Sequence, residues 1–145
     1  MDVQTLDVGR FKYRKICHGR YFLVRSYAIQ THIEPRSVLS REYCFLHPRG
    51  MLYLSCGYKW DGPSGFVPDV ESLMRASAVH DALCGIIADN ELTVQHQRTA
   101  DLLYRRIAIS DGCPHALAKA QYALLRAYDA VLRAVAIRTS NEVRN

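Results

Sequence analysis

The stretch GYKWDGPSGFVP, residues 57–68, separates two parts of the chain that have different hydrophobic patterns. It holds three glycines and two prolines, which favour a loop over a strand or a helix. Before it, apolar and aromatic residues alternate with polar ones, a pattern typical of half-buried strands. After it, apolar residues recur at spacings of three and four, which is typical of helices. The sequence therefore predicts an α+β fold, in which a small antiparallel sheet from residues 1–60 packs against three helices in residues 69–138.

The expected elements follow from turn and capping residues. Strands are predicted at residues 11–14, 21–33, 43–46 and 51–56, with a turn at 34–40 and a hairpin at Pro48 and Gly50. The first helix should begin at Asp69 and run to about 87, and the second should run from Asn90 to about 109. The third should begin at Pro114 and reach about 138. We expect 1–145 to form one domain with a polar, frayed tail at 139–145.

Composition excludes several classes of protein. Hydrophobic residues make up 49% and charged residues 23%, so neither a fully disordered chain nor a fibrous repeat is expected. No apolar run approaches the roughly 18 residues of a membrane span, and residues 1–7 lack a signal-peptide pattern, which predicts a cytoplasmic location. The five cysteines are scattered without a C-x-x-C motif, so we expect reduced thiols and no zinc ribbon.

The positive charge belongs to the first part of the chain. Residues 1–60 contain ten Lys and Arg against four Asp and Glu. Such a surplus attracts nucleic acid, an anionic membrane face or an acidic protein, but it also fits the wet face of a half-buried sheet. Nucleic-acid binding through basic residues 10–59 is a prediction that we do not favour.

The first predicted helix carries two ionisable residues in an apolar context. His80 lies on the same helix face as Leu73 and Leu83, which predicts that the imidazole is buried. Asp81 lies about 100° around the helix, where little polar face remains. Buried ionisable groups are costly unless they are paired, so the two residues form either a structural pair or a working site.

Two further aspartates are candidates for the same site. Asp101 lies on the second helix, which should return antiparallel to the first, and we predict its carboxylate within about 2.6–3.2 Å of the His80 imidazole. The alternative is a surface ion pair with Arg98 or Arg105. Asp61 supplies either an oxygen ligand or an Asx-turn over the following Gly-Pro. Ser64 lacks a G-x-S-x-G context and is interpreted as a turn residue.

The third predicted helix has one apolar and one basic face. We expect the apolar seam to pack against the rest of the domain and the basic row to be solvated, with phosphate binding as the alternative. The seam consists of Leu117, Ala120, Leu124, Tyr128, Val131 and Val135, and the basic row consists of Lys119, Arg126 and Arg133.

Three motifs resemble a small phage- and prophage-encoded family of unknown function. They are the D-G-x-S loop at residues 61–64, the H-D-x-L helix at 80–83 and the A-D helix at 100–101, within a similarity that covers roughly 51–104. The resemblance implies a phage origin and a location in the infected host cytoplasm or in the virion. The family usually has a tyrosine after H-D-x-L, whereas this chain has Cys84.

The same helix is similar to the H-D helix of secreted phospholipases, which carry H-D-x-C-Y and an aspartate on an antiparallel helix. This resemblance implies that His80 is a general base and that Asp101 orients it. It also implies that Asp81 binds calcium together with carbonyls of the loop that begins at Asp61. The phospholipase disulfides and glycine pattern are missing here.

These observations lead to two hypotheses on function. The first is a phage-encoded hydrolase that uses His80 and Asp101, with calcium or magnesium held by Asp81 and Asp61, on an ester or amide of the host envelope. The hard oxygen ligands disfavour zinc. The second is a non-catalytic virion component or an inhibitor that binds a host factor through the basic sheet.

Overall fold

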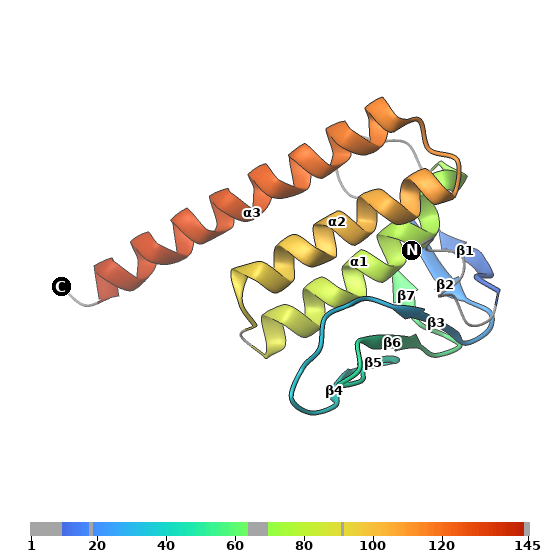
Figure 1. Cartoon of the computed structure of the whole chain (residues 1–145), viewed down its shortest axis with the longest axis horizontal. Helices are drawn as coiled ribbons and strands as arrows, with labels where there is room; N and C mark the ends of the chain where they lie inside the picture. Colours follow the sequence, from blue (N-terminus) through green and yellow to red (C-terminus); the bar gives the residue numbers. More distant parts are fainter. Residues whose placement is uncertain (1–9, 18, 64–69, 91, 144–145) are drawn as a thin grey trace.

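The computed structural model describes residues 10–17, 19–63, 70–90 and 92–143, and it has the predicted α+β class (Figure 1). Two antiparallel sheets come from the first part of the chain and three helices from the second. Helix α1 (Glu71–Asp89) contacts strands of both sheets, α2 (Val94–Ser110) packs on α1, and α3 (His115–Val143) packs on α2. None of the helices in these ranges combines the length and apolar character needed to cross a membrane.

The single predicted sheet is two sheets. Strands β1 (Tyr13–Cys17), β2 (Arg20–Leu23) and β7 (Lys59–Trp60) form one in the order β1-β2-β7. Strands β3 (Tyr27–Gln30), β6 (Met51–Leu54), β5 (Cys44–Leu46) and β4 (Leu39–Arg41) form the other in that order. Gly57 has a φ of 92°, and its N–H donates to the Leu23 carbonyl at 2.8 Å. This reversal takes the chain out of the second sheet and places β7 beside β2. Residues 59–60, which were predicted as part of the loop at 57–68, therefore form a short strand.

The predicted hairpin at Pro48 and Gly50 is confirmed. Leu46 pairs with Leu52 across it, and Gly50 has a φ of 86°, a conformation that glycine adopts without strain. A second hairpin, between β4 and β5, was not predicted and overlaps the expected turn at 34–40. Its turn places Tyr43 at a φ of 64°, and a Glu-Tyr pair carries none of the usual hairpin signals.

The helices begin and end near the predicted residues with two corrections. The second helix begins at Val94 after Thr93, because Asn90 instead terminates α1 and its side chain donates to the Ile86 carbonyl at 2.8 Å. The third helix continues through the expected tail to Val143. The predicted cap Asp69 lies outside the described residues.

The apolar seam of α3 packs only near its start. Leu117 is partly buried, which follows the prediction, whereas Ala120 is exposed, contrary to it. Leu124, Tyr128, Val131 and Val135 are each more than half exposed, so for them the prediction was wrong. There are two physical reasons. α3 meets α2 through a different face, on which Gln121 and Arg126 contact Tyr104 and Asp101, and its second half projects past the ends of α1 and α2 (Figure 1).

Candidate active site

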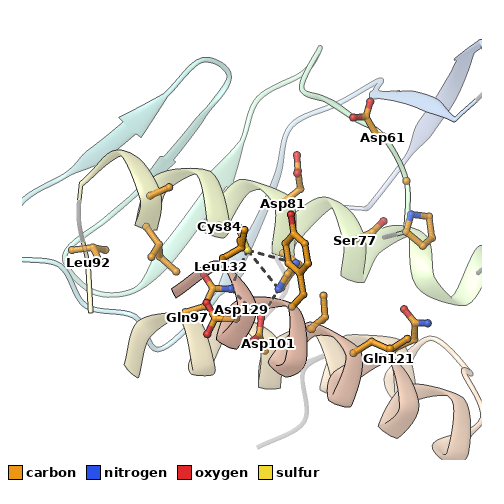
Figure 2. A pocket seen from close by; sticks show the side chains of 18 residues that line it. Asp61, Ser77, Asp81, Cys84, Leu92, Gln97, Asp101, Gln121, Asp129 and Leu132 are labelled. Atoms are coloured by element: carbon orange, nitrogen blue, oxygen red, sulfur yellow. Dashed lines mark hydrogen bonds and ion pairs between the residues drawn. The ribbon is translucent and has the colours of Figure 1, made fainter. Parts of the chain in front are cut away.

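The predicted contact between His80 and Asp101 is confirmed. His80 Nε2 lies 2.6 Å from Asp101 Oδ1, and both side chains are buried between α1 and α2 (Figure 2). Helix α1 presents His80 on its apolar face, and the antiparallel return of α2 brings Asp101 opposite to it. The geometry is that of an imidazole N–H donating to a carboxylate.

Asp101 is the centre of a network that joins all three helices. It is 1% exposed, and it accepts hydrogen bonds from Arg126 Nη1 at 2.9 Å and from Gln97 Nε2 at 3.0 Å. The alternative of a surface pair with Arg98 or Arg105 was wrong, since Asp101 faces the core. These contacts satisfy a buried carboxylate that would otherwise be costly.

Arg126 corrects the prediction of a solvated basic row on α3. It reaches back from α3 to Asp101 and is itself largely covered, while Arg133 pairs with Asp129 one turn earlier. The spacing of seven residues correctly placed Arg126 and Arg133 on one face of the helix. Spacing alone does not show that Arg126 on this face turns toward α2.

The electrostatics of the pair favour two charged partners. Burial of His80 opposes protonation, but its hydrogen bonds to Asp101 and Cys84 outweigh this effect and raise the pKa of His80 to about 9. Burial likewise opposes ionisation of Asp101, but hydrogen bonds from His80, Arg126 and Gln97 hold its pKa below the ordinary value. Imidazolium and carboxylate are therefore the forms present at neutral pH.

This ionisation makes stability depend on pH. Because the pKa of His80 is higher in the folded chain than its ordinary 6.5, its contribution is fully present below about pH 6.5 and is lost as the pH rises through 9. We expect the free energy of unfolding to fall by up to ~3 kcal/mol over that window, at about 1.4 kcal/mol per pKa unit. Urea unfolding at constant ionic strength from pH 6 to 10 measures it. The same pH series of urea unfolding in His80→Gln separates the contribution of His80 from that of cysteine titration. If the free energy of unfolding changed with pH in parallel in the two proteins, the predicted role of His80 would be contradicted.

The structure adds Cys84 to the pair. Its Sγ lies 3.5 Å from Nε2 and 3.6 Å from Nδ1 of His80, and Gln97 Nε2 lies 3.2 Å from the sulfur. The sequence analysis treated Cys84 only as a departure from a family's tyrosine. Its position four residues after His80 puts both side chains on one helix face, and that spacing is the signal that was overlooked.

Asp81 and Asp61 do not join this centre. Asp81 is exposed, contrary to the prediction, and accepts a hydrogen bond from the Tyr58 hydroxyl at 2.9 Å. The Asp61 side chain is 86% exposed and lies 3.7 Å from Arg20 Nε. Ser64 lies outside the described residues. Within the described ranges no three His, Cys, Asp or Glu side chains are grouped as metal ligands, so the cation stays a prediction.

A pocket of about 940 Å³ opens beside the His80 centre, between α3 and the first two helices (Figure 2). Its volume is within the range of about 300–1,000 Å³ that small-molecule sites occupy. Polar side chains line one part of it: Ser77, His80, Asp81, Cys84, Gln97 and Asp101. Apolar side chains line another: Ile87, Ala88, Leu92, Leu124, Leu125 and Leu132. The reactive groups are therefore accessible from a cavity of mixed character.

The resemblance of three motifs to a phage family depends on the sequence alone. The geometry of His80, Asp101 and Cys84 is therefore the basis on which a function is inferred. No family model, curated protein or solved structure matches this chain significantly.

Proposed function

We propose that the protein is a hydrolase in which Cys84 is the nucleophile, His80 the general base and acid, and Asp101 the residue that orients His80. The observation that carries this proposal is the position of Cys84 Sγ, 3.6 Å from His80 Nδ1, while Asp101 holds Nε2 of the same ring. A nucleophile, a base and an orienting carboxylate in this order form the arrangement used for covalent acyl transfer.

The steps follow from that arrangement. Cys84 reacts as a thiolate beside the imidazolium of His80, and it attacks the carbonyl carbon of an ester. The tetrahedral intermediate collapses, the carbon–oxygen bond breaks, and the alcohol leaves with the proton from His80 Nδ1. Neutral His80 then takes a proton from water, which attacks the thioester, and the acid is released as the Cys84 thiolate is expelled beside the restored imidazolium. The net reaction is ester plus water to acid plus alcohol.

Gln97 and Arg126 support these steps. Gln97 Nε2 lies 3.2 Å from the sulfur, so its amide is positioned beside the place where the carbonyl oxygen becomes negative. Arg126 binds the second carboxylate oxygen of Asp101 and so fixes its orientation toward His80. We assign Arg126 as a positioning residue.

The biological setting extends the motif resemblance. In this proposal the protein is phage-encoded, acts in the infected host or in the virion, and cleaves an ester or amide of the host envelope. Asp61 and Asp81, at the edge of the pocket, are the residues toward which calcium or magnesium would be directed.

A binding function is the second candidate. Four basic residues are exposed on or beside β1 and β2, and they are the surface through which an acidic host factor would bind: Lys12, Arg14, Lys15 and Arg20. In that case the His80 centre is a structural network and Cys84 is an ordinary thiol.

Thiol reactivity distinguishes the two candidates. We expect iodoacetamide at pH 7 to alkylate Cys84 at least ~10-fold faster than the exposed Cys17 and Cys56, because an adjacent imidazolium stabilises the attacking thiolate. His80→Gln should abolish the difference. Peptide mass spectrometry over time measures each rate in the same sample. Equal rates at the three cysteines would exclude a nucleophilic Cys84.

Turnover provides the second measurement. Cys84→Ala should lower kcat for p-nitrophenyl esters by at least ~1,000-fold, as expected for loss of a nucleophile, while Cys56→Ala should not change it. The assays are carried out with chelator and with millimolar calcium or magnesium, so that the predicted cation is tested together with the thiol. Unchanged turnover in folded Cys84→Ala would contradict the proposal.

A further inference from the structure

We infer that the substrate carries an acyl chain of medium length, and that this chain lies in the apolar part of the pocket between α3 and the first two helices. The inference deepens the proposed function and rests on it, because Cys84 has to meet the carbonyl carbon. The observation behind it is the composition of the lining: Cys84 and His80 share one pocket with a set of aliphatic side chains, which we call the apolar wall.

The apolar wall is built from two directions. Ile87 and Leu92 come from the end of α1 and the turn that follows it, and Leu124, Leu125 and Leu132 come from α3. On α3 the lining residues lie between positions 124 and 132, a span of nine residues and about 12 Å of helix. Such a wall accommodates an extended aliphatic chain, whereas a short acetyl group leaves most of it unused.

The charged residues around the pocket further restrict the chemical class of the substrate. Four aspartates line the pocket, and three of them face a cation: Asp101 faces His80 and Arg126, Asp129 faces Arg133, and Asp61 faces Arg20. The described lining residues include no Lys or Arg that would bind a polyanion, so phosphate-rich substrates and nucleic acid are disfavoured. A neutral ester or amide of a medium-chain acid places its carbonyl group beside the polar residues of the pocket and its hydrocarbon chain beside the apolar residues.

The exposure of the α3 side chains indicates a groove that needs an occupant. Leu124 is 57% exposed and Leu132 is 50% exposed although both line the pocket. Apolar surface left open in this way gains free energy when a chain covers it, at about 0.8 kcal/mol for each methylene that is fully buried. Continuity with Cys84 identifies the acyl chain, rather than a second protein, as that occupant.

Chain length is the first test. We expect kcat/KM for p-nitrophenyl octanoate to exceed that for the acetate by about 50-fold, since six additional methylenes become about half buried. The double variant Leu124→Gln/Leu132→Gln should reduce this preference to ~5-fold or less. Ile137→Gln is the matched control: it makes the same apolar-to-polar change on α3, at 62% exposure, outside the pocket lining. It should leave the preference unchanged.

Binding without turnover separates this inference from the proposed function. Octanamide, a neutral probe, is titrated into Cys84→Ala by calorimetry, with acetamide as the short-chain comparison. Octanamide should bind, and Leu124→Gln/Leu132→Gln in the same background should weaken it at least ~5-fold. If octanamide binds in this way while wild type cleaves no ester, the acyl pocket stands and the hydrolase proposal fails.

Three results would overturn the inference. They are equal cleavage of octanoate and acetate esters, no octanamide binding, and an effect of Ile137→Gln as large as that of the pocket variant. Sedimentation of each variant identifies the competing occupant. A dimer of wild type that dissociates in both variants would assign the apolar surface of α3 to a second copy of the chain.

Discussion

Replacing Asp101 by asparagine is expected to lower the free energy of unfolding by about 3–5 kcal/mol, the cost of breaking a buried ion pair by removing one partner. Asp101 accepts from both His80 and Arg126, and the amide neutralises the charge that both of them face. Asparagine has nearly the same shape as aspartate, so the loss of unfolding free energy measures the effect of the charge and not that of a cavity. Urea unfolding at pH 7 provides the measurement.

The same variant should change the ionisation of His80. Without the carboxylate, burial dominates, and the His80 pKa should fall from about 9 to below its ordinary 6.5. The NMR titration of the His80 ring protons follows this change directly. Asp89→Asn is the matched control, because Asp89 also faces an arginine, with 2.9 Å between its carboxylate and Arg41 Nε, but its side chain is 52% exposed, so we expect less than ~1 kcal/mol. Equal losses in the two variants would contradict a special role for Asp101.

Replacing Arg75 by alanine should destabilise the fold by a similar ~3–5 kcal/mol. Arg75 is buried on α1 and donates to both carboxylate oxygens of Asp111, at 2.8 and 3.0 Å, and to the Tyr27 hydroxyl at 3.1 Å. It thereby connects the start of α1, the end of α2 and β3. Alanine leaves Asp111 without this partner and opens a cavity.

Two comparisons sharpen this prediction. Arg41→Ala removes an exposed pair with Asp89, whose atoms are 2.9 Å apart, and should cost less than ~1 kcal/mol. Arg75→Met should recover part of the loss, because an unbranched apolar side chain refills the cavity that alanine leaves while Asp111 stays accessible to water. A loss below about 1 kcal/mol for Arg75→Ala in urea unfolding would show that the contact is not important for stability.

Local sequence patterns predicted which helices and strands form better than they predicted which distant strands pair. Helical spacing and the Gly-Pro stretch at 57–68 identified three helices and the change from strands to helices, because these signals are local. The division into two sheets depends on Gly57 directing β7 to β2, a pairing between distant segments that periodicity does not encode. The β4–β5 hairpin lacked turn residues, so only tertiary contacts reveal it.

The candidate site was predicted in part for the same reason. His80 and Asp101 are on helices whose antiparallel packing follows from a short connection, so their contact was predictable. Arg126 was misassigned because helix periodicity gives a face but not the neighbour that this face meets. Asp81 was expected to be enclosed because its helix is rich in apolar residues, yet it lies on the solvent-facing side of α1, where the Tyr58 hydroxyl donates to it.

The overhang of α3 gives this helix one fixed and one yielding part. Near Arg126 the helix is fastened to Asp101, which is buried, and this contact holds the α3 side of the pocket against α2. From 134 to 143 every residue is exposed, and those turns depend chiefly on backbone hydrogen bonds within the helix, which are marginal for short segments in water. Helix–coil exchange of such turns takes less than about a microsecond, far faster than a typical catalytic cycle. The end of α3 therefore unwinds and reforms many times during one cycle of the proposed reaction, whereas the α3 residues that line the pocket end at Leu132, before these turns begin.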